Sequence, residues 1–216
     1  MDEVRAVRPG CEWSADGPLV EPVSAATSLA FVLAALLLAA RRRRAEQAPA
    51  PAYALLVAGV GVGSFVQHGP DPAWSDPAHD LPLAGVLCFL AADTFAALTG
   101  RRRRWWWWAV PTASLMVPVV LAPRAGDLAQ VVVAGVAGGL LLVRARREPS
   151  ARVPVVVAVA VLTLGGLVGT LSRTGGPLCD PSSLFQGHAV WHLASAGALV
   201  VLAPLVTPDA PRPGRD

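Results

Sequence analysis

The amino-acid sequence predicts an all-α membrane protein: a bundle of seven transmembrane helices with its N-terminus outside and its C-terminus in the cytoplasm. Hydrophobic residues make up 54% of the 216-residue chain and charged residues 15%, whereas about a quarter of a typical soluble domain is charged. So few charged groups cannot cover a surface that faces water on all sides. The apolar residues are also gathered in seven long blocks, which indicates repeated membrane crossings.

Each apolar block approaches the length of about 20 residues that a helix needs to cross a hydrocarbon core of roughly 30 Å. The second block contains Gly59, Gly61 and Gly63, which favour close packing between helices. The fourth opens with the tryptophans 105–108, and indole rings are typical of the membrane interface. The acidic segment 1–22 lacks the basic start of a signal peptide, so we expect it to be an extracytoplasmic segment. The predicted spans are residues 23–40, 52–68, 81–99, 105–122, 127–143, 153–171 and 187–206.

The placement of the arginines predicts the orientation of the chain. All 18 cationic residues are arginine, and the runs within 41–44, 101–104 and 144–147 each adjoin the end of an apolar block. With the N-terminus outside, 14 of the 18 arginines fall on the cytoplasmic side, as the positive-inside rule requires. The spans therefore form one domain, 23–206, followed by a cytoplasmic tail, 207–216.

The composition also indicates the location of the protein and the partners it lacks. Arginine- and alanine-rich usage is typical of a GC-rich bacterial gene, so we expect an integral, multi-pass protein of a bacterial plasma membrane. The net charge of +3 does not indicate nucleic acid as a partner, because base-stacking aromatic residues are not interleaved with the arginines.

The side chains that can do chemistry fall toward the outer ends of the predicted spans. His68 ends the second span, and His188 and His192 open the seventh at a spacing that places both rings on one helix face. Ser64 and His68 repeat that spacing, and Asp80 precedes the third span. A lone histidine near a span end is more often a hydrogen-bonded interfacial residue, but three of them at one membrane face favour a metal site. Three neutral imidazoles with an open fourth position are the ligands of a catalytic zinc ion.

Three sequence motifs occur in a fixed order at the outer ends of the predicted spans. They are Cys11-Glu-Trp with Glu21-Pro-Val-Ser-Ala-Ala-Thr-Ser-Leu-Ala-Phe31, Gly63-Ser-Phe-Val-Gln-His68, and Gly187-His-Ala-Val-Trp-His192. In order, spacing and placement the chain resembles the alkaline ceramidase branch of the CREST superfamily, which includes the adiponectin receptors and other seven-helix proteins. The resemblance covers nearly the whole chain and implies a hydrolase-like domain. Where that family often has Asn, this chain has Ser24 and Ser28.

The resemblance implies a role for each predicted site residue. His68, His188 and His192 would be the zinc ligands, and Ser64 would lie beside the metal to orient water or to stabilise an oxyanion. Asp80 would activate the water or orient a ligand histidine. The implied reaction is hydrolysis of the amide bond of a ceramide-like N-acyl lipid to a fatty acid and a sphingoid base. The expected partners are therefore a lipid amide substrate and membrane lipids.

One position in this assignment stays open. The family places its Asp three residues before a Pro at the start of the third span, whereas Asp80 lies two residues before Pro82. Asp76 and His79 therefore remain alternatives to Asp80 as the acid or base.

The outer segments carry two further predictions. Glu12 and Glu21, with Asp16 as an additional candidate, resemble the calcium-binding stretch of the alkaline ceramidases, and carboxylate oxygens suit calcium. A solvated acidic segment is the alternative interpretation. Cys11 and Cys179 both fall outside, where an oxidising compartment permits a disulfide, and we expect them to be bonded.

Two other functions are compatible with the sequence. A receptor or sensor of the same superfamily would use the bundle without turnover. A haem-binding membrane protein would take axial ligands from histidines on facing helices. The preferred prediction is the zinc-dependent lipid amide hydrolase, and the sequence carries no signal for an oligomeric state.

Overall fold

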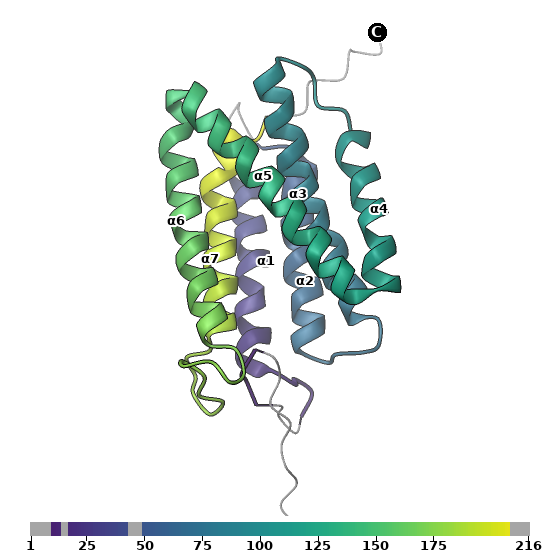
Figure 1. The fold of residues 1–216 in the computed structure, drawn as a ribbon, viewed down its shortest axis with the longest axis vertical. Helices are drawn as coiled ribbons and strands as arrows, with labels where there is room; N and C mark the ends of the chain where they lie inside the picture. Colours follow the sequence, from purple (N-terminus) through teal and green to yellow (C-terminus); the bar gives the residue numbers. More distant parts are fainter. Residues whose placement is uncertain (1–9, 14–16, 43–48, 208–216) are drawn as a thin grey trace, which may run out of the picture.

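The computed structural model places the chain in a bundle of seven α helices, and it describes residues 10–13, 17–42 and 49–207 (Figure 1). The helices are α1 Pro22–Arg42, α2 Pro51–His68, α3 Ser75–Thr99, α4 Trp106–Leu121, α5 Pro123–Arg147, α6 Pro149–Leu171 and α7 Gly187–Leu202, followed by the 3₁₀ turn η1 Ala203–Leu205. The all-helical prediction is confirmed. Asp16 lies outside the described residues, as do 1–9, Arg43, Arg44 and the predicted tail beyond residue 207.

The helices begin and end where proline and glycine permit. Proline occupies the first turn of α2, α5 and α6, where its missing N–H is not needed for an intrahelical bond. Gly100 ends α3 in the left-handed conformation at a φ of 66°. The start of α3 differs most from the prediction, because the helix begins at Ser75 rather than at residue 81. Pro77 falls in its first turn and is tolerated there, so His79 and Asp80 lie on the helix and not before it.

Five of the helices have the length and the apolar composition to cross a membrane. They contain the segments Pro22–Arg41, Ser75–Thr99, Leu128–Arg147, Pro149–Leu171 and Gly187–Leu205, and α4 is a shorter apolar helix. Many apolar side chains point outward, as in Leu33, Leu121 and Val153, which are 66%, 78% and 70% exposed. An apolar outer surface of this kind belongs in lipid rather than in water. The chain is therefore a helical protein built for a membrane.

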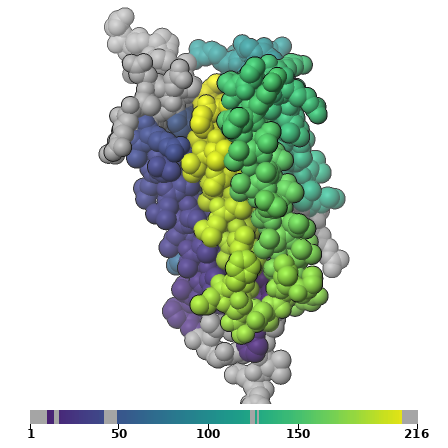
Figure 2. Space-filling view, turned by 90° about the vertical axis from the view of Figure 1, so that its left-hand side faces the viewer, coloured from purple at the N-terminus to yellow at the C-terminus, as the bar shows by residue number. Residues whose placement is uncertain are grey.

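The helices pack so that α7 lies between α1 and α6, as the space-filling view in Figure 2 shows. On the other side, α2 packs against α1 and α3, and α3 in turn packs against α4 and α5. Close contact is possible because a glycine faces a neighbour at several crossings; a Cβ at Gly61 would lie 2.8 Å from Val32. The Tyr53 hydroxyl in the core donates to the Leu199 carbonyl at 2.7 Å and joins α2 to α7. This packing brings the start of α1, the end of α2 and the start of α7 to one end of the bundle, the lower end in Figure 1.

The opposite end of the bundle is held by buried charges. Asp93 on α3 is 1% exposed, and it is ion-paired with Arg103 and accepts a hydrogen bond from the Thr207 hydroxyl. The Arg103 guanidinium also lies 4.3 Å from the centre of the Phe89 ring. Arg144 on α5, likewise buried, donates to the Leu205 carbonyl at 2.8 Å. Two arginines that the sequence marked only as orientation signals thus join the end of α7 to the rest of the bundle.

Candidate metal centre

Three histidines from two helices meet at the lower end of the bundle. His68 is the last residue of α2, whereas His188 and His192 lie one turn apart at the start of α7. Their ligand atoms all lie within 4.8 Å of one another, and the Nε2 atoms of His68 and His188 are 3.1 Å apart. Among the described residues these three form the group of metal-ligating side chains that could hold an ion. The structure thus brings together the three residues that the sequence singled out as ligands.

A buried glutamate orients the first of these rings. The Nδ1 atom of His68 lies 2.5 Å from Oε2 of Glu21, and both side chains are buried. The carboxylate accepts the Nδ1 proton, so that the lone pair of the neutral ring is on Nε2, which lies 3.1 Å from Nε2 of His188. A carboxylate that fixes the tautomer of a histidine in this way is typical of metal sites. Glu21, predicted from sequence as a calcium ligand, is here the hydrogen-bond partner of His68.

A threonine on α1 orients the ring of His192. The Thr27 hydroxyl oxygen lies 3.1 Å from Nδ1 of His192, and it also lies 2.9 Å from the Val23 carbonyl oxygen and 3.1 Å from the Ser24 carbonyl oxygen in the preceding turn. With its proton on one of these carbonyls, the hydroxyl is placed to accept from Nδ1 of His192. The lone pair of His192 is then on Nε2, as in His68. Thr27 escaped the sequence analysis because a threonine that bonds the preceding turn is an ordinary helix residue.

Ser64 completes the polar wall of the site. Its hydroxyl oxygen lies 3.3 Å from Nε2 of His192 and 2.8 Å from the hydroxyl oxygen of Ser28. Ser28 gives its proton to the Ser24 carbonyl at 2.8 Å, so Ser64 donates to Ser28. The Ser64 hydroxyl is thus within hydrogen-bond distance of both Ser28 and His192. The sequence does carry a signal for the α1 side of this polar wall: the hydroxyl residues 24, 27 and 28 lie on one face of an otherwise apolar helix.

This set of donors fits a zinc ion. Zinc takes imidazole nitrogens at about 2.0–2.1 Å in a tetrahedron, which places neighbouring nitrogens about 3.3 Å apart. The 3.1 Å separation between His68 and His188 is close to that value. Glu21 and Thr27 contact Nδ1 of two of the rings, which leaves Nε2 of each ring available as the ligand atom. Three protein ligands leave the fourth position open, as in catalytic zinc sites.

The candidates for the acid or base lie on the first turns of α3. Asp80 accepts a hydrogen bond from Nδ1 of its neighbour His79 at 2.9 Å, and Asp76 accepts one from Gln67 at 2.8 Å. Within the described residues neither carboxylate joins the group formed by the three histidines. Gly63 lets α3 approach, because a Cβ there would lie 2.3 Å from the Ala78 carbonyl oxygen. The role of Asp80 stays a prediction.

Glu12 holds the start of α1 in place. Its carboxylate accepts hydrogen bonds from the backbone N–H groups of Val23 at 2.6 Å and Ser24 at 3.0 Å, and from the Ser24 hydroxyl at 2.7 Å. A carboxylate at a helix N-terminus satisfies unpaired N–H groups and is favoured by the helix dipole. The buried Glu12 thus fixes the helix that supplies Thr27 and Ser28 to the site. Calcium binding by Glu12 and Glu21 stays a prediction.

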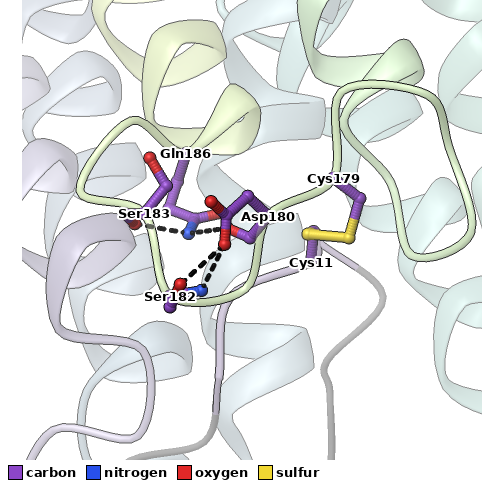
Figure 3. The surroundings of a disulfide bond; sticks show 6 residues. All are labelled: Cys11, Cys179, Asp180, Ser182, Ser183 and Gln186. Carbon is purple, nitrogen blue, oxygen red and sulfur yellow. Dashed lines mark hydrogen bonds between the residues drawn. A yellow bond between two sulfur atoms is a disulfide. The ribbon is translucent and has the colours of Figure 1, made fainter.

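A disulfide joins the N-terminal segment to the loop before α7 (Figure 3). Cys11 and Cys179 are bonded with their Cα atoms 5.6 Å apart. In the same loop Asp180 accepts bonds from the Ser182 N–H and hydroxyl, which lower the pKa of its carboxyl. Gln186 donates to the carbonyl of Asp180 at 3.2 Å and to that of Ser183 at 2.7 Å. These contacts fix the residue that directly precedes α7.

The N-terminal segment also covers one of the histidines. A Cβ added at Gly10 would lie 3.5 Å from the Cβ of His188 and 3.8 Å from a carboxylate oxygen of Glu21. The segment is held from both sides, since Cys11 is bonded to the loop and Glu12 is bonded to α1. Gly10 therefore lies against His188 and Glu21 at this end of the bundle.

Comparison with known proteins supplies no family for the chain: no protein-family model matches it, and no curated protein matches it. The arrangement of the site therefore rests on its own geometry.

Proposed function

We propose that the chain is a zinc-dependent intramembrane hydrolase that cleaves the amide bond of a ceramide-like N-acyl lipid, like the alkaline ceramidases that its motifs resemble. The observation that carries the proposal is the group of His68, His188 and His192, whose ligand atoms lie within 4.8 Å of one another. The contacts of Glu21 and Thr27 with Nδ1 of His68 and His192 support it, because a partner on Nδ1 leaves Nε2 free to bind an ion.

The roles of the residues follow from their contacts. His68, His188 and His192 hold the ion. Glu21 and Thr27 fix the orientation of two of the rings, those of His68 and His192. A zinc ion with three histidine ligands supplies a polarised carbonyl and a bound water whose pKa is lowered to about 7. Ser64 presents a lone pair beside His192 and is positioned to orient a water or to contact the substrate. Asp80, paired with His79 at the start of α3, is the proposed proton carrier.

The orientation of the bundle supports a lipid substrate. We place all seven helices across the membrane with the N-terminus outside, so that the arginine runs 101–104 and 144–147 lie on the cytoplasmic side. The three histidines then lie at the outer ends of α2 and α7, near the boundary between acyl chains and headgroups. The amide of an N-acylated lipid lies at that same depth, because its acyl chain is apolar and its headgroup is not. A soluble amide would have no need of a site in a bundle with an apolar outer surface.

The metal content of single variants tests the proposal. Purified wild-type protein is expected to carry one zinc ion per chain, and His68→Ala and His188→Ala are each expected to lose it. His79→Ala is the matched control, because His79 is bonded to Asp80 and does not belong to the group of three. Unaltered zinc content in both ligand variants would refute the site.

Turnover separates a hydrolase from the other functions. The zinc-loaded protein is screened against N-acyl lipids, with release of free fatty acid as the signal. A zinc-loaded protein without turnover on any of them would favour a receptor or sensor of the same fold. A Soret band in the purified protein would favour haem in place of zinc.

A further inference from the structure

An apolar groove lies on the flank of the bundle farthest from α6 and α7. It has a volume of about 480 Å³ and is lined by side chains of α3, α4 and α5, among them Ala91, Phe95, Trp106, Val110 and Leu140. This volume lies in the range of roughly 300–1,000 Å³ that is typical of small-molecule sites. α4, at the edge of the bundle in Figure 1, packs against α3 and α5 and leaves the groove on the outer surface.

A run of arginines adjoins one end of this groove. Arg101, Arg102 and Arg104 are exposed in the linker between α3 and α4, and Trp106, two residues after Arg104, lines the groove. Arg103 differs from the other three, because it turns inward to the buried Asp93. Three exposed arginines therefore precede, in the linker, the helix whose first residue lines the groove.

The start of α4 adds to the attraction for an anion. The helix begins without a side-chain cap and without an acidic residue in its first turn. The positive end of its dipole therefore favours a negative charge at this point. Trp105 and Trp106 are 70% and 46% exposed there, and indole rings are typical of the depth at which lipid headgroups lie.

We infer that the groove binds an anionic phospholipid. One acyl chain lies between Ala91, Val110 and Leu140, and the phosphate is bound by Arg101, Arg102 and Arg104 beside the start of α4. Arginine suits phosphate because its planar guanidinium donates two parallel hydrogen bonds to the phosphate oxygens. A zwitterionic lipid fills the same groove but brings no net charge to the arginines. This site lies at the end of the bundle opposite the histidines and does not depend on the proposed function.

Native mass spectrometry of the full-length protein in a neutral detergent tests the charged part of the site. The protein is titrated with dioleoyl phosphatidylglycerol and, separately, with dioleoyl phosphatidylcholine, so that only the headgroup differs. We expect the anionic lipid to bind at least tenfold more tightly. In the triple variant Arg101→Gln/Arg102→Gln/Arg104→Gln its affinity should fall by roughly a hundredfold, since each of the three basic residues near an anionic lipid contributes about a fivefold factor.

The matched control removes the same kind of charge at the same end of the bundle. Arg146 and Arg147 are exposed at the end of α5 and do not line the groove. The variant Arg146→Gln/Arg147→Gln should bind phosphatidylglycerol within twofold of the wild type. Equal losses in both variants would show attraction by net charge alone, and no loss in the triple variant would show that the arginines do not bind the lipid. Either result overturns the inference.

A second variant tests the apolar part of the site. Ala91→Phe is expected to fill the groove and to weaken binding of both lipids, whereas Val153→Phe, on the outward face of α6, should bind both as the wild type does. Glycerol 3-phosphate, which carries the charge without an acyl chain, should bind at least a hundredfold more weakly than the lipid. Unchanged lipid binding in Ala91→Phe, or equal binding of glycerol 3-phosphate, would refute the groove. An unchanged melting temperature of each variant shows that the fold is kept.

Discussion

Replacement of Thr27 by valine tests the most specific contact of the metal centre. Valine has nearly the shape of threonine but has no oxygen to accept the Nδ1 proton of His192, which the Thr27 hydroxyl meets at 3.1 Å. The bond from Thr27 to the Val23 carbonyl is also lost, but such bonds to the preceding turn add little to helix stability. The substitution therefore acts on one ring and leaves the packing of α1 unchanged.

The expected magnitude follows from the burial of that ring. His192 is 3% exposed, so water does not replace the missing acceptor. Without the Thr27 oxygen the ring is less well held in the orientation and tautomer that place its lone pair on Nε2, where the ion binds. We therefore expect zinc to bind about 10- to 100-fold more weakly in Thr27→Val, the range typical for partners that orient a metal ligand.

Competition with a fluorescent zinc chelator measures this change directly. Thr27→Ser is the matched control, because it keeps the hydroxyl and should bind zinc within a few-fold of the wild type. The melting temperatures of the zinc-free proteins separate a loss of affinity from a loss of fold. Zinc affinity in Thr27→Val within twofold of the wild type would refute the assignment of the His192 tautomer.

Three further predictions concern the packing around the site and at the opposite end. Gly63→Ala should lower stability by about 1–3 kcal/mol, because the new methyl meets the Ala78 carbonyl oxygen, whereas Gly139→Ala, with open space around it, should not lower the melting temperature. The double variant Cys11→Ser/Cys179→Ser should lower the melting temperature, as should a reductant added to the wild type, since a cross-link over 168 residues is lost; equal melting curves would contradict this. Asp93→Ala should destabilise the protein by about 3–5 kcal/mol, because it leaves the guanidinium of Arg103 buried without its carboxylate; recovery of stability in Asp93→Ala/Arg103→Met would support that cause, and its absence would contradict it.

The histidines were the part of the site within reach of sequence reasoning. A spacing of four residues places His188 and His192 on one face of α7 whatever the tertiary structure, and the end of an apolar block locates His68. The residues that orient the rings could not be predicted from the sequence. Glu21 and Thr27 are 47 and 165 residues from the histidines that they contact, and nothing in the local pattern pairs them.

The fold shows the same division between local and distant information. The number of helices followed from the apolar blocks, but the predicted start of α3 at residue 81 lies six residues late, because the polar first turns of the helix are not part of an apolar block. The partner of Asp93 was missed because Arg103 follows the end of α3 and was interpreted as an orientation signal alone. Proline in a first turn and arginine near a membrane face each permit two structures, and tertiary contacts select between them.

X-ray absorption at the zinc edge of the purified wild-type protein measures the coordination of the metal itself. Three imidazole nitrogens at about 2.0–2.1 Å with one further light ligand are the spectrum expected for an ion held by His68, His188 and His192. A spectrum that fits oxygen ligands with one imidazole or none, or a protein that takes up no zinc, would contradict a shared ion between α2 and α7.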